Sequence, residues 1–209
     1  MKEDFITLGK NSVIYGIGTV VTKSFGLITL PIFTSFLSRE EYGVLAMLAL
    51  LTMVIEPIFG LGISVAMGPL YFEEKELAGK SKTIWSAFTI HVFSCTILVA
   101  LVCLFPGFLA QAVNLDIKYS SFVIVSLLGS SFAIASSSFV MRTQFEKQSK
   151  LFVLLTITCA LISIGLSLYF VVILESGALG ILYGQMIGKL FNLVGFMTVG
   201  LMKTIPSVN

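Results

Sequence analysis

Apolar residues fill six long stretches of this chain, and short polar connections separate them. Each stretch is close to or above the roughly 20 residues that an α-helix needs to cross the hydrocarbon core of a membrane. The pattern therefore predicts six membrane-spanning helices, with neighbours in sequence lying antiparallel in one bundle. The expected helices cover residues 12–37, 44–69, 84–105, 117–141, 151–174 and 178–202.

The composition agrees with this pattern. Hydrophobic residues make up 56% of the 209-residue chain and charged residues only 11%, whereas a soluble domain carries roughly 25% charged residues. So few charges cannot cover a water-facing surface, and we predict an all-α integral membrane protein with one six-helix lobe. The basic residues form no dense patch, which argues against a nucleic-acid partner. The first stretch has a lysine at its centre and no cleavage-site pattern, so we expect a spanning helix there and not a signal peptide.

The distribution of lysine and arginine predicts the orientation in the membrane. Basic residues gather in the tail before the first helix, in the second and fourth connections, and after the last helix. They are Lys2, Lys10, Lys75, Lys80, Lys82, Arg142, Lys147, Lys150 and Lys203. The opposite side carries only Arg39 and Lys118. Because basic connections stay in the cytoplasm, we expect both termini to be cytoplasmic and the protein to be multi-pass in the cytoplasmic membrane.

Local motifs mark helix ends and bends. Ser38 followed by Glu41 has the spacing of a capping box, which places the start of the second helix there. Residues 175–177 read as a tight turn between the last two helices. Pro31 and Pro57 lie inside predicted helices, and each is expected to bend its helix and to assist gating, because proline removes a backbone hydrogen bond.

Three charged residues lie deep inside the apolar stretches: Lys23, Glu56 and Lys189. A charged side chain at the bilayer centre costs at least about 2.5 to 3.5 kcal/mol on insertion scales. At 1.5 Å of rise per residue, all three approach the middle of a hydrocarbon core about 30 Å thick. Such residues usually mark a substrate or ion pathway, so we predict a transporter.

Two interpretations of these charges remain open. Lys23 and Glu56 lie on successive helices at similar depth and would form a purely structural pair, which leaves Lys189 without an acidic partner. Alternatively, the lysines line a wet, cationic lumen that receives an anion. We favour the lumen, with Thr19, Gln185 and Asn192 adding polar groups at helical spacing on the same faces. Glu56 is then the candidate ion-coupling residue.

The remaining features indicate packing and not chemistry. Gly180, Gly184 and Gly188 form a repeated G-x-x-x-G pattern that lets another helix approach closely. His91 is expected to be a polar group near the cytoplasmic interface. No catalytic motif or metal-ligand spacing appears, so we expect neither an enzyme, a metal site nor a cofactor.

The stretch from Leu30 to Gly43 resembles the junction between the first two helices of the polysaccharide biosynthesis flippases. It carries a leucine–proline near the end of the helix and then the turn Leu-Ser-x-x-Glu-Tyr-Gly. Residues 60–64 and 141–146 are similar to later segments of the same family, which belongs to the multidrug, oligosaccharidyl-lipid and polysaccharide exporter superfamily. The resemblance covers essentially the whole chain.

The resemblance implies a fold of two six-helix lobes around a central cavity with alternating access, and this chain matches the N-terminal lobe. It implies that the substrate is an undecaprenyl-diphosphate-linked oligosaccharide, moved between leaflets, with membrane lipids and a second lobe as partners. The second lobe would be a missing C-terminal half or a second copy of this chain. The alternatives are a cation-coupled multidrug antiporter of the same superfamily and a non-transporting membrane fragment or scaffold.

Overall fold

The computed structural model describes the backbone of residues 2–204 and the side chains of 13–201, except those of residues 15 and 19. All the regular structure in this described part is helical. The elements are α1 (Lys2–Phe36), α2 (Arg39–Gly60), α3 (Ile63–Glu73), α4 (Leu77–Leu104), α5 (Pro106–Ala112), η1 (Ile117–Tyr119), α6 (Ser120–Phe145), α7 (Ser149–Leu168), η2 (Tyr169–Ile173) and α8 (Gly177–Thr204).

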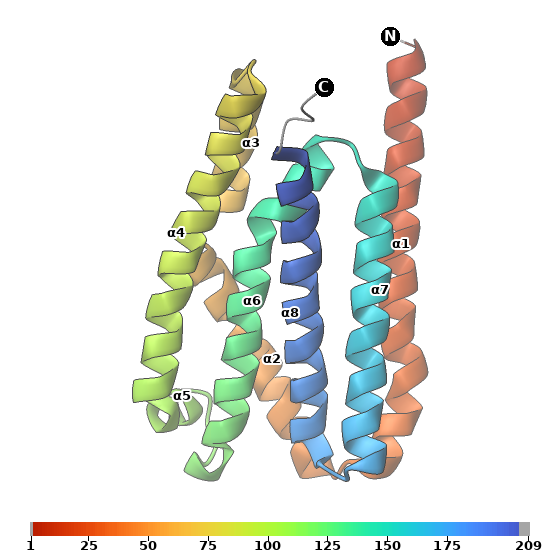
Figure 1. Ribbon diagram of the computed structural model, residues 1–209. Helices are drawn as coiled ribbons and strands as arrows, with labels where there is room; N and C mark the ends of the chain where they lie inside the picture. Colours follow the sequence, from red (N-terminus) through yellow and green to blue (C-terminus); the bar gives the residue numbers. More distant parts are fainter. Residues whose placement is uncertain (1, 205–209) are drawn as a thin grey trace.

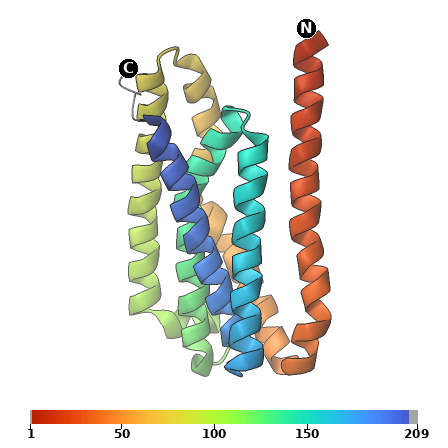
Figure 2. The same cartoon turned by 45° about the vertical axis from the view of Figure 1, so that its right-hand side comes forward.

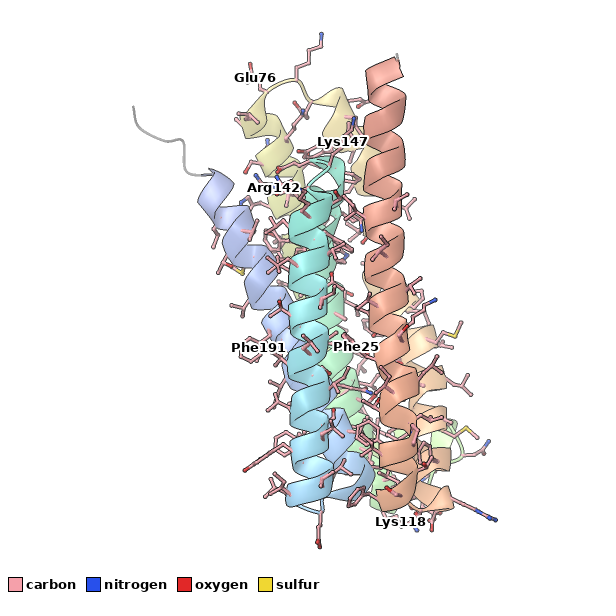
Figure 3. All side chains as sticks on the ribbon, turned by 90° about the vertical axis from the view of Figure 1, so that its right-hand side faces the viewer. Phe25, Glu76, Lys118, Arg142, Lys147 and Phe191 are labelled. Atoms are coloured by element: carbon pink, nitrogen blue, oxygen red, sulfur yellow. The ribbon has the colours of Figure 1, made fainter. Side chains whose placement is uncertain are left out.

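The described residues contain six helical segments long and apolar enough to cross a membrane, and α2 with α3 counts as one of them. This confirms the prediction of an all-α membrane bundle. Both ends of the described chain lie at the same end of the bundle (Figure 1). Arg142 and Lys147 are at that end and Lys118 is at the other (Figure 3), as the orientation rule requires.

Helix α6 occupies the centre of the bundle, where it packs against α8, α4 and α2. Small residues on α6 permit this close packing. A Cβ atom built on Gly129 would lie 3.4 Å from the Cα of Met186 on α8, so the two backbones come near each other. The result is a compact core that brings α2 and α8 to the same side of α6.

Helix α1 lies at the edge of the bundle. It packs mainly along α7, which in turn packs on α8 (Figure 2). Apolar side chains such as Val20, Leu27 and Ile28 are largely exposed on α1, as expected of a helix that faces lipid. Because α7 separates α1 from α8, neighbours in sequence are not the main neighbours in space at this edge.

The turn between α1 and α2 contains the predicted capping box, which the structure confirms. The Ser38 hydroxyl accepts a hydrogen bond from the Glu41 amide at 3.2 Å, and the Ser38 amide donates to Glu41 Oε2 at 2.8 Å. Glu41 Oε1 also accepts a bond from the amide of Ala178, at the start of α8, at 3.0 Å. One carboxylate therefore caps two helices and joins two turns at the same end of the bundle.

The second predicted helix is interrupted, which corrects the expectation of a single helix over residues 44–69. Helix α2 remains α-helical through Pro57 and ends at Gly60. Leu61 and Gly62 then adopt left-handed backbone angles, with φ of 51° and 64°, before α3 begins. The glycine tolerates this conformation without a steric penalty, so the chain breaks there and not at the proline.

Other boundaries differ in smaller ways. Helix α4 begins at Leu77 and not near residue 84, so the connection before it is shorter than expected. Helix α4 ends at Leu104, and Pro106 starts the short helix α5. The turn at residues 175–177 is present, with left-handed angles at Glu175 and Gly177. The preceding π-helical turn η2 has no signal in the hydrophobic pattern.

The three glycines of α8 face α7 and η2. A Cβ atom on Gly180 would lie 2.9 Å from the Cβ of Phe170, and one on Gly184 would lie 2.5 Å from the amide nitrogen of Ser167. At Gly188 the corresponding distance to the Cβ of Ser163 is 2.5 Å. All three distances are shorter than real Cβ contacts, so this interface has room for glycine alone.

Candidate functional site

The centre of the bundle contains an ion pair between Glu56 of α2 and Lys189 of α8. The Lys189 ammonium lies 3.1 Å from Glu56 Oε1. The Ser130 hydroxyl of α6 donates a hydrogen bond to the same oxygen at 2.9 Å. The two charged side chains are 35% and 37% exposed, so the pair lies on an open face and not in the sealed core. Lys189 is about 18 Å along the axis of α8 from Gly177, which places it near mid-membrane.

This pairing corrects the sequence interpretation of the charges. Lys189 has an acidic partner, and Lys23 does not provide a partner for Glu56. The physical reason is the packing order: α2 and α8 both pack on α6, whereas α1 packs mainly on α7. The site is therefore locally neutral as it stands, and not the uncompensated cationic lumen that we expected.

Three hollows surround the pair. The first, of about 150 Å³, lies between α2, α6 and α8 and is lined by Thr52, Ser126, Gln185 and Lys189 among others. The second, of about 240 Å³, lies between α6, α7 and α8 and is also lined by Gln185 and Lys189. The third, of about 290 Å³, has Glu56 in its wall. The ion pair thus lies where hollows on both sides of α8 meet one beside α2.

Side chains that carry polar groups line much of the second hollow, but most of the surface that the hollow exposes is apolar. Besides Gln185 and Lys189, its wall includes hydroxyl, amide and thiol side chains, namely Ser136, Thr156, Cys159, Ser163 and Asn192. Hydroxyl and amide groups both donate and accept hydrogen bonds, which is what sugar hydroxyls or phosphate oxygens require of a protein surface. The wall thus offers several hydrogen-bonding groups within a largely apolar surface.

The predicted site residues are only partly brought together. Lys189, Gln185 and Asn192 share the second hollow. Lys23 is exposed on α1, it lines none of these three hollows, and no carboxylate in the described part of the chain pairs with it. The side chain of Thr19 lies outside the described residues.

His91 lies deep in the bundle and not near the interface, which corrects the expectation for this residue. It is fully buried on α4. Its Nδ1 lies 2.9 Å from the Ser138 hydroxyl, and its Nε2 lies 3.3 Å from the carbonyl oxygen of Gly60. The Ser94 hydroxyl donates to the Phe59 carbonyl at 2.6 Å. These bonds satisfy carbonyl groups that the break between α2 and α3 leaves without helical partners.

Sequence reasoning missed Ser130 as a member of the site. It is completely buried, and its hydroxyl donates to Glu56. Ser126, Gly129 and Ser130 belong to a run of small residues on α6 that the sequence does show. A small-residue surface predicts close helix packing, but nothing in its spacing says that one hydroxyl meets a carboxylate.

Comparison with known proteins identifies the family. Residues 8–208 match the family model described as "Polysaccharide biosynthesis protein". No curated protein and no solved structure matches the chain. The family match covers nearly the whole chain, and it agrees with the resemblance of the Leu30 to Gly43 junction. The chain therefore belongs to the polysaccharide biosynthesis protein family.

Proposed function

We propose that this chain forms one lobe of a flippase that moves an undecaprenyl-diphosphate-linked oligosaccharide across the cytoplasmic membrane. Proteins of this family are generally lipid-linked oligosaccharide flippases and not enzymes. The observation that carries the proposal is the Glu56–Lys189 pair, which lies half-exposed near mid-membrane, beside hollows that Gln185 also lines. A charged pair at that depth is costly unless it faces water or a polar ligand.

In this proposal the open face of α2, α6 and α8 forms the wall of a lumen that a second lobe completes. Lys189 binds the diphosphate, and Gln185 and Asn192 contact neighbouring polar groups. Lys23 acts as a second cation on α1, away from the pair. The second lobe is a C-terminal half or a second copy of this chain, and either would enclose the hollows that are open here.

Transport then requires the two lobes to rock between inward-open and outward-open states. The break at Leu61 and Gly62 divides the second span into two segments, and with Pro31 and Pro57 it supplies places where helices can bend. Glu56 is the candidate coupling residue, because its charge changes when it binds a proton and it already contacts the cationic group of the site.

The test is a flipping assay with the native polypeptide in proteoliposomes. A fluorescent oligosaccharide on a polyprenyl diphosphate is placed in the liposomes, and an impermeant quencher reports the rate of its exchange between leaflets. We expect Lys189→Gln and Lys23→Gln to lower the rate at least roughly tenfold, the equivalent of about 1.4 kcal/mol of lost binding. Lys118→Gln is the matched control, because its ion pair with Glu40 lies exposed at the end of the bundle. Wild-type rates in both the Lys189 and Lys23 variants would refute the proposal.

A further inference from the structure

Lys189 is paired with the carboxylate of Glu56, and that carboxylate makes few hydrogen bonds. Both bonds to Glu56, from the Lys189 ammonium and from the Ser130 hydroxyl, go to the same oxygen, Oε1. Within the described residues, Oε2 of Glu56 has no hydrogen-bond partner. A carboxylate that is bonded through one oxygen on a half-exposed face loses little interaction free energy when another anion replaces it at the ammonium.

A more deeply buried ion pair in the described part of the bundle, between Arg142 and Glu146, provides a contrast. Arg142 donates to Glu146 at 2.7 Å and to the Gly200 carbonyl at 2.8 Å, and Glu146 also accepts a bond from Gln148. Its two side chains are only 11% and 23% exposed. That pair joins α6 to α8 through several bonds and is structural. The Glu56–Lys189 pair has fewer bonds and more exposure, so it is the exchangeable one.

Both partners have space around them for an exchange. Lys189 forms part of the wall of two hollows, so an anion can reach the ammonium from the side away from Glu56. Glu56 lines the third hollow together with Ser64 and Ser137, whose hydroxyls are 3.2 Å apart. A carboxylate that leaves Lys189 can turn into this hollow, where the Ser64 hydroxyl can donate to it in place of Ser137.

We propose that Glu56 is an internal stand-in for the phosphate of the substrate: it occupies the anion site on Lys189 when the lumen is empty, and the incoming diphosphate displaces it. This inference rests on the proposed function and adds the competition between the two anions. The empty site is then electrically neutral and inexpensive in the membrane, and it becomes cationic only toward a ligand that replaces the carboxylate. Among the described residues, two other titratable side chains lie near this part of the bundle. His91 is bonded to the Gly60 carbonyl one turn beyond Glu56, and the Cys95 thiol donates to the Ser131 carbonyl.

The competition predicts that weakening Glu56 strengthens anion binding. The experiment titrates inorganic pyrophosphate, without divalent cations, into the native polypeptide in lipid nanodiscs and measures the dissociation constant by calorimetry. We expect Glu56→Gln to bind roughly tenfold more tightly than the wild type, which corresponds to about 1.4 kcal/mol. Ser130→Ala should shift affinity in the same direction by a smaller factor, because it removes one of the two bonds that hold the carboxylate. Lys189→Gln should lose binding.

Glu40→Gln and Lys118→Gln are matched controls, because they break a lysine–glutamate pair of similar length far from the hollows. Neither should change the affinity. If Glu56→Gln and Ser130→Ala bind as the wild type does while Lys189→Gln loses binding, the competition is wrong and the proposed function stands. If neither the wild type nor Glu56→Gln binds pyrophosphate, the proposed function fails. Unchanged binding in Lys189→Gln would show that pyrophosphate binds elsewhere, which overturns both.

Discussion

Two glutamates have different roles in this chain: Glu41 stabilises one end of the bundle, and Glu56 neutralises a cation at its centre. Glu41 accepts hydrogen bonds from the backbone amides of Ser38 and Ala178 and so caps α2 and α8 together. Glu56 accepts from Ser130 and Lys189. The two residues have the same side chain, but the first satisfies helix termini and the second compensates a cation. Their substitutions should therefore have different effects.

Glu41→Ala should destabilise the protein, because it removes the carboxylate half of the capping box of α2 and the bond to the first turn of α8. Losing one cap costs about 0.5 to 2 kcal/mol, so we expect a loss of about 1 to 3 kcal/mol in the free energy of unfolding. Thermal unfolding of the purified protein in detergent, followed by circular dichroism, measures this. Within the part of the chain that the structure describes, the carboxylate of its neighbour Glu40 bonds to side chains alone, those of Lys118 and Tyr119, so Glu40→Ala is the control. Equal melting temperatures for the two variants would show that the double cap contributes nothing.

Removing one member of the central pair should cost more stability than removing both. Lys189→Gln leaves a Glu56 carboxylate without its cation, whereas the Glu56→Gln, Lys189→Gln double variant leaves two neutral amides that can bond to each other. We expect the double variant to be more stable than Lys189→Gln by about 1 kcal/mol. A double-mutant cycle of unfolding free energies gives this number. If the two effects simply add, the side chains do not interact.

The sequence indicates which residues carry charge inside the membrane, but it does not indicate which of them meet. Glu56 and Lys189 are visible as polar positions in apolar stretches, and both lie in the site. Their pairing depends on α2 and α8 packing on the same side of α6, and a one-dimensional pattern holds no information on that. The pattern likewise does not show that Lys23 lies away from this pair, which follows from the packing of its helix on α7.

At the scale of helices, the pattern of apolar residues locates the spans well and their interruptions poorly. The capping box at Ser38 and the turn at Gly177 agree with the structure because each depends on local chemistry alone. The break at Leu61 and Gly62 was not predicted, because the carbonyls it frees are satisfied by His91 and Ser94 of another helix. Local rules fail where distant residues supply the hydrogen bonds.

Gly184→Ala should separate α7 from α8. The added methyl group would lie 2.5 Å from the Ser167 amide nitrogen and 2.7 Å from its Cα, and a backbone cannot give way as a flexible side chain does. Overpacking of this kind costs about 1 to 3 kcal/mol. Gly165→Ala on α7 is the control, since nothing lies within 4 Å of its Cβ position, and it should be neutral or slightly stabilising. Unfolding by denaturant compares the two, and equal midpoints would contradict the close approach of these helices.

At the scale of the whole molecule, the polar face of α2, α6 and α8 and the apolar faces of the outer helices meet different surroundings. The outer helices expose leucine, valine and phenylalanine, as lipid-facing surfaces do. The polar face carries the ion pair and its hollows. The proposed lumen requires water on this face and lipid on the opposite face of α8.

The most direct measurement of that claim compares two cysteine variants in a Cys95→Ala, Cys103→Ala, Cys159→Ala background. Gln185→Cys places a thiol in the hollows, and Val194→Cys, nine residues on, places one about two and a half turns away on the opposite, lipid-exposed face. A charged maleimide that does not enter lipid is added to intact membranes, and labelling rates are compared. We expect Gln185→Cys to react at least roughly tenfold faster than Val194→Cys, because only hydrated thiolates react quickly. Equal, slow labelling of both would show that the Glu56–Lys189 face is sealed or faces lipid, and the lumen would be refuted.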